Sequence, residues 1–382
     1  MAFSKLFLTS LLFSLLLLLP SKAQATDFLI APYLQYPSSS SMTLVWEQDD
    51  QDHLMTVRYG EGNFADYQQA LPQDSNLFRL TLEELSPNTR YSYSFEMDGE
   101  ILLESFFWTA PAPGDVESPF HFLAMGDTRS NHVAHTTVIE AMSAVDNVRF
   151  YLHSGDMVSS GSVREQWRTF FEIEAPILSH APIIPSTSNH DVSRGNSWFF
   201  DDYFAEPGEE VYYSISYGPI LLLSLDGYVN ASSGNRFSTQ QMEWIEGELQ
   251  RSVLMVGREY TIILVHVGPF GASEGRSGNA QMRELLDLFD LYEVNLILSG
   301  HDHTYMRNRA ENGIWCITSA GGGAHLYGAT CRNYPCYRDG YTTFFSQAIY
   351  HFMLFEYQEG MLEAEVFDTE GTMIDQFFIS NE

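Results

Sequence analysis

Lysine is almost absent from this sequence of 382 residues. Its two lysines, Lys5 and Lys22, both lie near the N-terminus, and arginine supplies the other cations. Asp and Glu number 50 against 19 Lys and Arg, which gives a formal net charge of −31. Because nucleic acids and anionic membranes are held mainly by lysine and arginine, we do not expect this chain to bind either. An anionic small molecule would need a local source of positive charge.

Cysteine is also scarce, with three residues in the chain, Cys316, Cys331 and Cys336. In an exported protein Cys331 and Cys336 could close a loop disulfide. Cys316 lies in the apolar stretch GIWCITSA, which predicts a buried thiol. No CxxC spacing supports a zinc site built from cysteines.

Long hydrophobic runs are missing after the first residues of the chain. Near the start, Lys5 precedes an apolar run from Leu6 to Leu19, and small residues follow at Ala23 and Ala25. The run is shorter than the roughly 20 residues that span a membrane. We therefore predict a cleaved signal peptide over residues 1–25 and an exported protein, periplasmic or secreted, with an uncleaved anchor as the alternative. The mature chain is expected to contain no membrane span.

Short segments rich in branched and aromatic residues, such as MTLVWEQ and YSYSFEM, occupy residues 26–110. This pattern predicts an all-β sandwich. The segment LSPNTRYSY, with Leu85, Pro87, Thr89 and Tyr91, resembles the Leu-x-Pro-x-Thr-x-Tyr signature of fibronectin type III domains, in which the tyrosine braces a corner. Proline is concentrated in the segment that follows, which predicts a linker over residues 111–119.

Residues 120–382 have a different pattern, in which apolar strand-like runs alternate with helical stretches such as QMRELLDLFDLY. This alternation is typical of an α/β domain. The segment YYSISYGPILLLSLDG instead predicts a hairpin that turns at Gly218-Pro219. The second domain is therefore expected to mix parallel and antiparallel strands.

Five apolar runs of this second domain end in residues that can bind metal ions. Ligands of open α/β sheets bind beyond the carboxyl ends of the strands, so these residues are expected to meet at one edge. Each alone is typical of a turn or a core histidine, whereas the ordered set predicts a metal site. Asp, Asn and His without thiolate favour Mn, Zn, Fe, Ni or Co. The residues are Asp127 after FHFLAMG, Asp156 after VRFYLHSG, Asn189, His190 and Asp191 after APIIPSTS, His266 after YTIILV, and His301 and His303 after VNLILSG.

The order of these motifs resembles the calcineurin-like metallophosphoesterase superfamily: Gly-Asp, Gly-Asp, Asn-His-Asp, His and Gly-His-x-His. The fibronectin-like segment and SGHDHTYMR are similar to its purple acid phosphatase branch. The resemblance implies a four-layer α/β/β/α domain with two packed mixed sheets. It also implies a phosphoric ester hydrolase for small phosphorylated substrates, with a metal-activated hydroxide. A phosphomonoesterase like the acid phosphatases is the first expectation, and a phosphodiesterase or nucleotidase is the alternative.

The same resemblance assigns a role to each strand-end residue. Asp156 bridges two metal ions, expected to be Mn, Zn or Fe. His190 protonates the leaving oxygen or holds the phosphate. The other ligands divide between the two ions, with Asp127 and His303 on one and Asn189, His266 and His301 on the other.

Three positions depart from the family pattern. Ser159 stands where purple acid phosphatases have an iron(III)-binding tyrosine, so we expect a colourless protein. Arg129 stands where many members have a histidine ligand, and it could grip phosphate or pair with a carboxylate. His132 or His135 could replace that ligand. Ser188 stands where the family has glycine, so its loop could differ. These departures leave open a second hypothesis, a non-catalytic surface-binding protein with a degenerate metal site.

Overall fold

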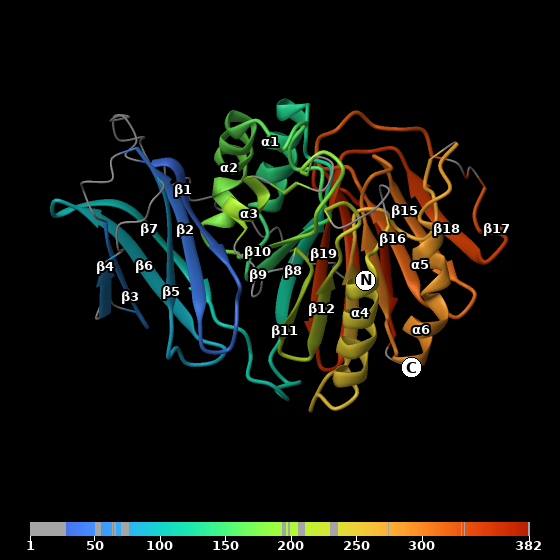
Figure 1. Cartoon of the computed structure of the whole chain (residues 1–382), viewed down its shortest axis with the longest axis horizontal. Helices are drawn as coiled ribbons and strands as arrows, with labels where there is room; N and C mark the ends of the chain where they lie inside the picture. Colours follow the sequence, from blue (N-terminus) through green and yellow to red (C-terminus); the bar gives the residue numbers. More distant parts are fainter. Residues whose placement is uncertain are drawn as a thin grey trace, which may run out of the picture.

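The protein consists of a β-rich N-terminal part and a larger part built on two further sheets (Figure 1). No helix within the described residues is long and apolar enough to cross a membrane. The predicted signal peptide lies outside those residues. The computed structural model describes residues 28–49, 55–62, 64, 66–69, 76–192, 196–197, 199–204, 211–229, 236–273, 275–329, 331 and 333–380.

Seven strands form two antiparallel sheets at one end of the molecule, blue to teal in Figure 1. The sheets share one core, in which Trp46 stacks on Phe78 of its own sheet and meets Phe95 of the other at 4.9 Å between ring centroids. One sheet has the order β1 (Phe28–Gln35), β2 (Met42–Gln48), β5 (Leu77–Leu82), and the other β4 (Asp66–Gln69), β3 (Thr56–Gly60), β6 (Arg90–Met97), β7 (Glu100–Trp108).

The tyrosine of the fibronectin-like motif makes the contact that its position predicts. The Tyr91 hydroxyl oxygen accepts the backbone N–H of Ser86 at 2.9 Å, five residues upstream. This bond fixes the chain where it enters β6, as a tyrosine corner does. It supports the fibronectin type III-like interpretation, which stays a proposal for this part of the chain.

A six-stranded mixed sheet carries the first three predicted ligand strands. Strands β8, β9 and β10 are parallel neighbours, and β19 runs antiparallel beside β8. Helices α1 and α2 cover its outer face through a core that includes Val138 and Trp167. The sheet order is β10 (Ile183–Pro185), β9 (Val148–His153), β8 (Phe120–Met125), β19 (His351–Gln358), β20 (Met361–Asp368), β21 (Met373–Ile379); the helices are α1 (His132–Met142), α2 (Arg164–Leu178) and the short α3 (Phe199–Tyr203).

An eight-stranded mixed sheet carries the other two ligand strands. The predicted hairpin is present, because β11 and β12 pair antiparallel around Gly218, whose φ is 54°. Helices α4, α5 and α6 cover the outer face through Ile245, Met282 and Phe289. The order is β11 (Tyr213–Tyr217), β12 (Ile220–Ser224), β13 (Tyr260–Leu264), β14 (Leu296–Ser299), β16 (Trp315–Ser319), β15 (Tyr305–Ala310), β18 (Tyr341–Gln347), β17 (Cys336–Arg338); the helices are α4 (Thr239–Ser252), α5 (Ala280–Glu284) and α6 (Leu286–Leu291).

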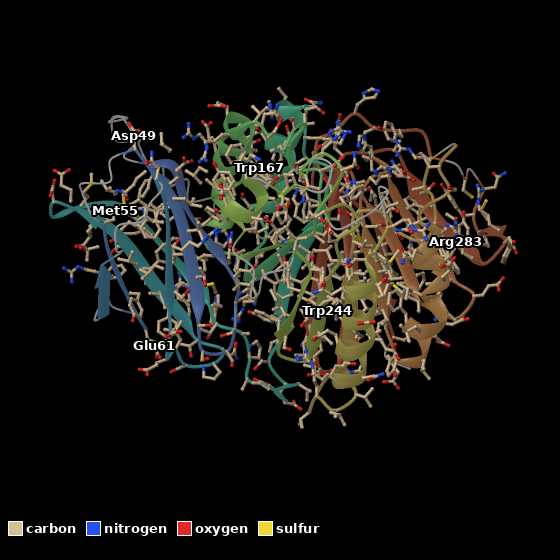
Figure 2. The ribbon with its side chains drawn as sticks, in the orientation of Figure 1. Asp49, Met55, Glu61, Trp167, Trp244 and Arg283 are labelled. Carbon is tan, nitrogen blue, oxygen red and sulfur yellow. The ribbon has the colours of Figure 1, made fainter. Side chains whose placement is uncertain are left out.

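The inner faces of these two sheets pack against each other. Phe150 of β9 meets Tyr217 of β11 at 4.6 Å between ring centroids, inside a core that draws on both sheets. Figure 2 labels Trp167 on α2 and Trp244 on α4, on the two outer helical layers. The predicted α/β/β/α architecture with two packed mixed sheets is confirmed. All three cysteines are free thiols, and Cys316 is buried as predicted.

A buried carboxylate joins the N-terminal sheets to the second part. Glu47 of β2 is 1% exposed in its side chain and accepts hydrogen bonds from two arginines of α2. The N···O distances are 3.2 Å to Arg164 and 2.9 Å to Arg168. Because removing one partner of such a cluster leaves unpaired charge, the contact is expected to be costly to break.

Glu47→Gln should lower the free energy of unfolding by about 2–4 kcal/mol, because the two arginines lose their counter-charge. Urea denaturation at neutral pH measures the change. Glu104→Gln, an exposed position of β7, is the matched control and should stay within about 0.5 kcal/mol of the parent. Equal stability of the two variants would contradict the role of Glu47.

His351 gives the fold a dependence on pH. The ring is fully buried, with Nδ1 donating to the Ile349 carbonyl at 2.9 Å and Nε2 accepting from Ser319 Oγ at 3.1 Å. Burial lowers the pKa of His351 to about 4. An unfolded histidine has a pKa of about 6.5, so the unfolded chain binds more protons between these two values.

The contribution of His351 should therefore be fully present above pH 6.5 and should decline as the pH falls toward 4, by about 3 kcal/mol in total. Unfolding free energies measured across this range for the parent and for His351→Gln test the expectation. The variant should lose less stability on acidification, and parallel curves would show that His351 does not titrate in this way.

Candidate metal centre

The polar residues of the five strand ends gather where the carboxyl ends of two sheets adjoin. Asp127 and Asp156 follow β8 and β9 of the six-stranded sheet. His266, His301 and His303 come from the facing eight-stranded sheet, so the predicted edge is shared by two sheets. The turn after β10 adds Asn189 and His190, β13 is followed by His266, and β14 by His301 and His303.

The carboxylates and histidines lie close enough to share a cation. Ligand atoms of Asp127, Asp156 and His266 all lie within 4.8 Å of one another. His266 Nε2 is 3.3 Å from Asp156 Oδ1 and 3.2 Å from His301 Nδ1. On the other side, His303 Nε2 is 3.3 Å from Asp127 Oδ1. His301 and His303 therefore face different partners, although one residue separates them.

A hydrogen bond directs the lone pair of His266 into the centre. His266 Nδ1 donates to the Ser154 carbonyl at 2.8 Å, which leaves Nε2 as an acceptor toward Asp156. Asp156 Oδ1 is buried and has no hydrogen-bond partner within the described part of the chain. A nitrogen lone pair and an orphaned carboxylate oxygen that face each other are the donor set of a metal ion. The His266 side therefore fits an ion.

Strained backbone places these side chains. Asp127, Asp156 and His301 have φ values of 62°, 59° and 70°, in the left-handed region that residues other than glycine seldom adopt. A Cβ on Gly300 would lie 2.3 Å from Asp127 Oδ2, so glycine there admits the carboxylate. The same oxygen accepts the His301 backbone N–H at 2.9 Å. The Gly-Asp and Gly-His motifs thus reflect close approach between two turns.

Burial and neighbouring charges set the protonation of the centre. Burial opposes ionisation of Asp156, yet His266, His190 and Arg129 hold its pKa below the usual range. Burial and the charge of Asp156 raise the pKa of Asp127. Burial, with His266 and Arg276 nearby, lowers the pKa of His301 to about 3. A neutral imidazole beside a carboxylate is the form in which these groups bind metal.

Asp191 holds the turn that carries Asp156. Its two oxygens accept the backbone N–H groups of Asp156, Met157 and Val158 at 2.9, 2.9 and 3.1 Å. Asp191 Oδ2 also accepts from Ser188 Oγ at 2.8 Å. The backbone of Ser188 does not have positive φ, so serine fits at this position without strain. The sequence analysis included Asp191 in the Asn-His-Asp motif but did not predict that it holds the Asp156 turn.

Arg129 lies inside the centre. Its Nε is 2.9 Å from Asp156 Oδ2, and its NH2 is 3.5 Å from His303 Nε2. One oxygen of Asp156 therefore faces His266 and the other faces a guanidinium. The predicted salt bridge to a carboxylate is present.

The remaining candidates lie at the rim or outside. Asn189 is exposed, and half-buried His190 places Nδ1 2.9 Å from the Ser159 carbonyl. His132 is exposed, whereas buried His135 pairs with Glu174 at 2.8 Å. Among these described residues, neither His132 nor His135 contacts the carboxylates of the centre.

Arg276 is the residue that the sequence analysis missed. Its NH1 contacts His301 Nε2, and its Nε is 3.5 Å from Asp302 Oδ1. The guanidinium also lies over the ring of Tyr327, 5.1 Å from the centroid. A cavity of about 580 Å³ opens beside it, lined also by Ser273 and His325. The one available sign was an arginine in the Gly-rich segment GASEGRSGNA soon after His266.

Asp191→Asn should loosen the centre without abolishing it, because an amide presents one acceptor oxygen where the carboxylate presents two. At least one of the three N–H groups would lose its partner, at a cost of about 1–3 kcal/mol. Metal affinity should fall by about 10- to 100-fold. Calorimetric titration with Zn²⁺ measures this, and an unchanged affinity in a destabilised variant would limit Asp191 to a structural role.

Comparison with known proteins agrees with this geometry. The family model described as calcineurin-like phosphoesterase matches residues 120–305. Residues 120–305 therefore form a calcineurin-like phosphoesterase domain. This family consists of metal-dependent phosphoric ester hydrolases, and the matched residues contain β8 to β14 with every predicted ligand.

Individual relatives point to the purple acid phosphatase branch of the calcineurin-like phosphoesterases. Purple acid phosphatase 18 of Arabidopsis thaliana is 22% identical over 321 residues, which cover 77% of this chain and 69% of that protein. Several other curated relatives are covered over only about half of their length, 50% and 54% in two cases.

Two solved structures share the fold. Purple acid phosphatase PPD1 from yellow lupin (Lupinus luteus) seeds has a TM-score of 0.74 at 20% identity, over 91% of this chain and 74% of that one. A structure of PhoD has a TM-score of 0.71 at 12% identity, over 94% of both chains. Both similarities extend through the N-terminal sheets, so the two-part architecture is common to all three proteins.

Proposed function

We propose that this chain is an exported, metal-dependent phosphoester hydrolase that acts as a phosphomonoesterase on small phosphorylated substrates. The observation that carries the proposal is the orphaned, buried Asp156 Oδ1, which faces the lone pair of His266 Nε2. Calcineurin-like phosphoesterases use metal ions to hydrolyse phosphoric esters, and this pair of donors would bind such an ion. Export is supported by the signal-like residues 1–25.

Asp156, His266 and His301 would hold a metal ion, with the exposed Asn189 at the mouth as a further ligand. When bound, the ion supplies positive charge for a phosphoryl oxygen and makes water a nucleophile at neutral pH. Mn, Zn or Fe suits the oxygen and imidazole donors. Ser159 offers no tyrosinate, so a colourless protein remains our expectation.

The chain's own residues bind and orient the substrate. Arg276, beside His301, and Arg129, beside Asp156, supply the fixed positive charge that an acidic surface otherwise denies to a phosphate. His190 donates from Nδ1 to the Ser159 carbonyl, which fixes the ring. When the ring is doubly protonated, Nε2 also carries a proton, which it would give to the leaving oxygen.

A phosphodiesterase is the second candidate function. The cavity of about 580 Å³ beside Arg276 and Tyr327 favours it, because a second ester group could occupy that space. Turnover of aryl monophosphates and bis-aryl phosphates with Mn, Zn, Fe, Co and Ni in turn distinguishes the two activities. A protein that turns over neither ester with any of these metals would instead support a binding role.

Asp156→Asn and His266→Ala should each lower kcat/KM for the better ester by at least about 10³-fold, or about 4 kcal/mol, because the first removes the negative charge of a ligand and the second removes an imidazole ligand. His121→Ala is the control, since His121 lies at the far end of β8 and contacts the Asp146 carbonyl. Circular dichroism would confirm folding of all three variants. Parental activity in folded Asp156→Asn would refute the proposed function.

A further inference from the structure

Arg129 occupies the side of the centre where the family resemblance implies a second metal ion. That ion would take Asp127, Asp156 and His303 as ligands. In the structure, the Arg129 guanidinium already contacts both Asp156 Oδ2, at 2.9 Å, and His303 Nε2, at 3.5 Å. Metal–ligand bonds to such atoms are about 2.0–2.2 Å long. An ion bound to that oxygen and that nitrogen would compete with the guanidinium for the same space.

Charge makes this competition unfavourable for an ion. Arginine stays protonated in proteins, so its charge cannot be removed to make room for a metal. The side chain of Arg129 is 17% exposed and that of Asp156 is 1% exposed, so solvent and salt screen this region weakly. Two carboxylates with one guanidinium and one divalent ion leave a net charge of about one positive unit. A second divalent ion would add two more beside the guanidinium.

Lack of space does not force Arg129 into this position. A cavity of about 280 Å³ lies beside the arginine, lined also by Ser130, His132, His135 and Ser159. The side chain contacts Asp156 and His303 although that cavity offers room elsewhere. Attraction to the carboxylate, reinforced by the bond from the Arg129 backbone N–H to the Asp156 carbonyl at 3.1 Å, explains the placement.

We propose that the centre holds one metal ion, on the side of Asp156 Oδ1, His266 and His301, and that the Arg129 guanidinium replaces the other ion. The proposal deepens the proposed function at the same site and concerns its metal content, which can be measured without any substrate. It departs from the two-ion centre that the family resemblance implies.

Under this proposal Asp127 and His303 position other residues and do not bind a metal ion. His303 Nε2 accepts from Arg129, and Asp127 accepts the His301 backbone N–H, so both become positioning residues. Arginine has five N–H groups, of which Nε and one on NH2 have the partners described above. Within the described part of the chain the other three have no hydrogen-bond partner, which leaves them for oxygens of a phosphoryl group.

The test is the number of ions per folded chain. Protein saturated with Mn²⁺ and then desalted is analysed by mass spectrometry of its metals and by electron paramagnetic resonance. The parent should retain one ion with the spectrum of an isolated Mn²⁺. Arg129→His removes the cation and adds an imidazole, so it should retain two ions whose spins couple. Two ions in the parent, or one in folded Arg129→His, would overturn the proposal.

Two further variants separate charge from ligand loss. Arg129→Lys keeps the positive charge and should retain one ion. Arg129→Gln is neutral but offers no imidazole, so it should take a second ion at least about tenfold more weakly than Arg129→His does. If Arg129→His does not fold, a single ion in both Arg129→Lys and Arg129→Gln would refute the role of charge. A parent that binds one ion but hydrolyses no ester would refute the proposed function and leave this inference intact.

Discussion

The buried carboxylate of Asp156 is the group on which the centre depends. One of its oxygens faces the His266 lone pair, and the other faces the Arg129 guanidinium. A buried carboxyl group stays ionised only where cations or hydrogen-bond donors compensate its charge. The turn that presents it is itself held by three N–H bonds to Asp191. The placement of the arginine and of the turn follows from the need to compensate one charge, and so does the position that we propose for the ion.

Packing of the two sheets makes that arrangement possible. The aspartates come from β8 and β9 and the histidines from β13 and β14, so neither sheet alone has the complete set of donors. Aromatic contacts such as Phe150 with Tyr217 fix the distance between the sheets. Because interiors are densely packed and do not deform easily, the turns at the strand ends meet in one geometry. Asp127, Asp156 and His301 adopt a strained left-handed backbone, which this close approach of the turns requires.

The strands, the hairpin at Gly218 and the convergence of the strand-end residues could be predicted because each depends on local patterning or on a spaced motif. The roles of those residues as ligands stay predictions. The sequence did not reveal Arg276, which reaches His301 from a loop 25 residues earlier in the chain. It also did not reveal Glu47, whose arginine partners lie more than 100 residues away. Contacts of this kind depend on how the sheets and helices pack. The local periodicity of the sequence therefore could not predict the contacts of Arg276 and Glu47.

The net charge of −31 acts in opposite directions on the two ligands of the centre. An acidic surface raises the concentration of cations near the protein, which favours metal binding at the proposed site. The same surface repels phosphate, and metal capture does not remove that repulsion at a distance. Arginines fixed beside Asp156 and His301 do so locally and independently of the metal supply. We therefore expect these two arginines to contribute more to binding of the proposed phosphorylated substrate than to retention of the metal.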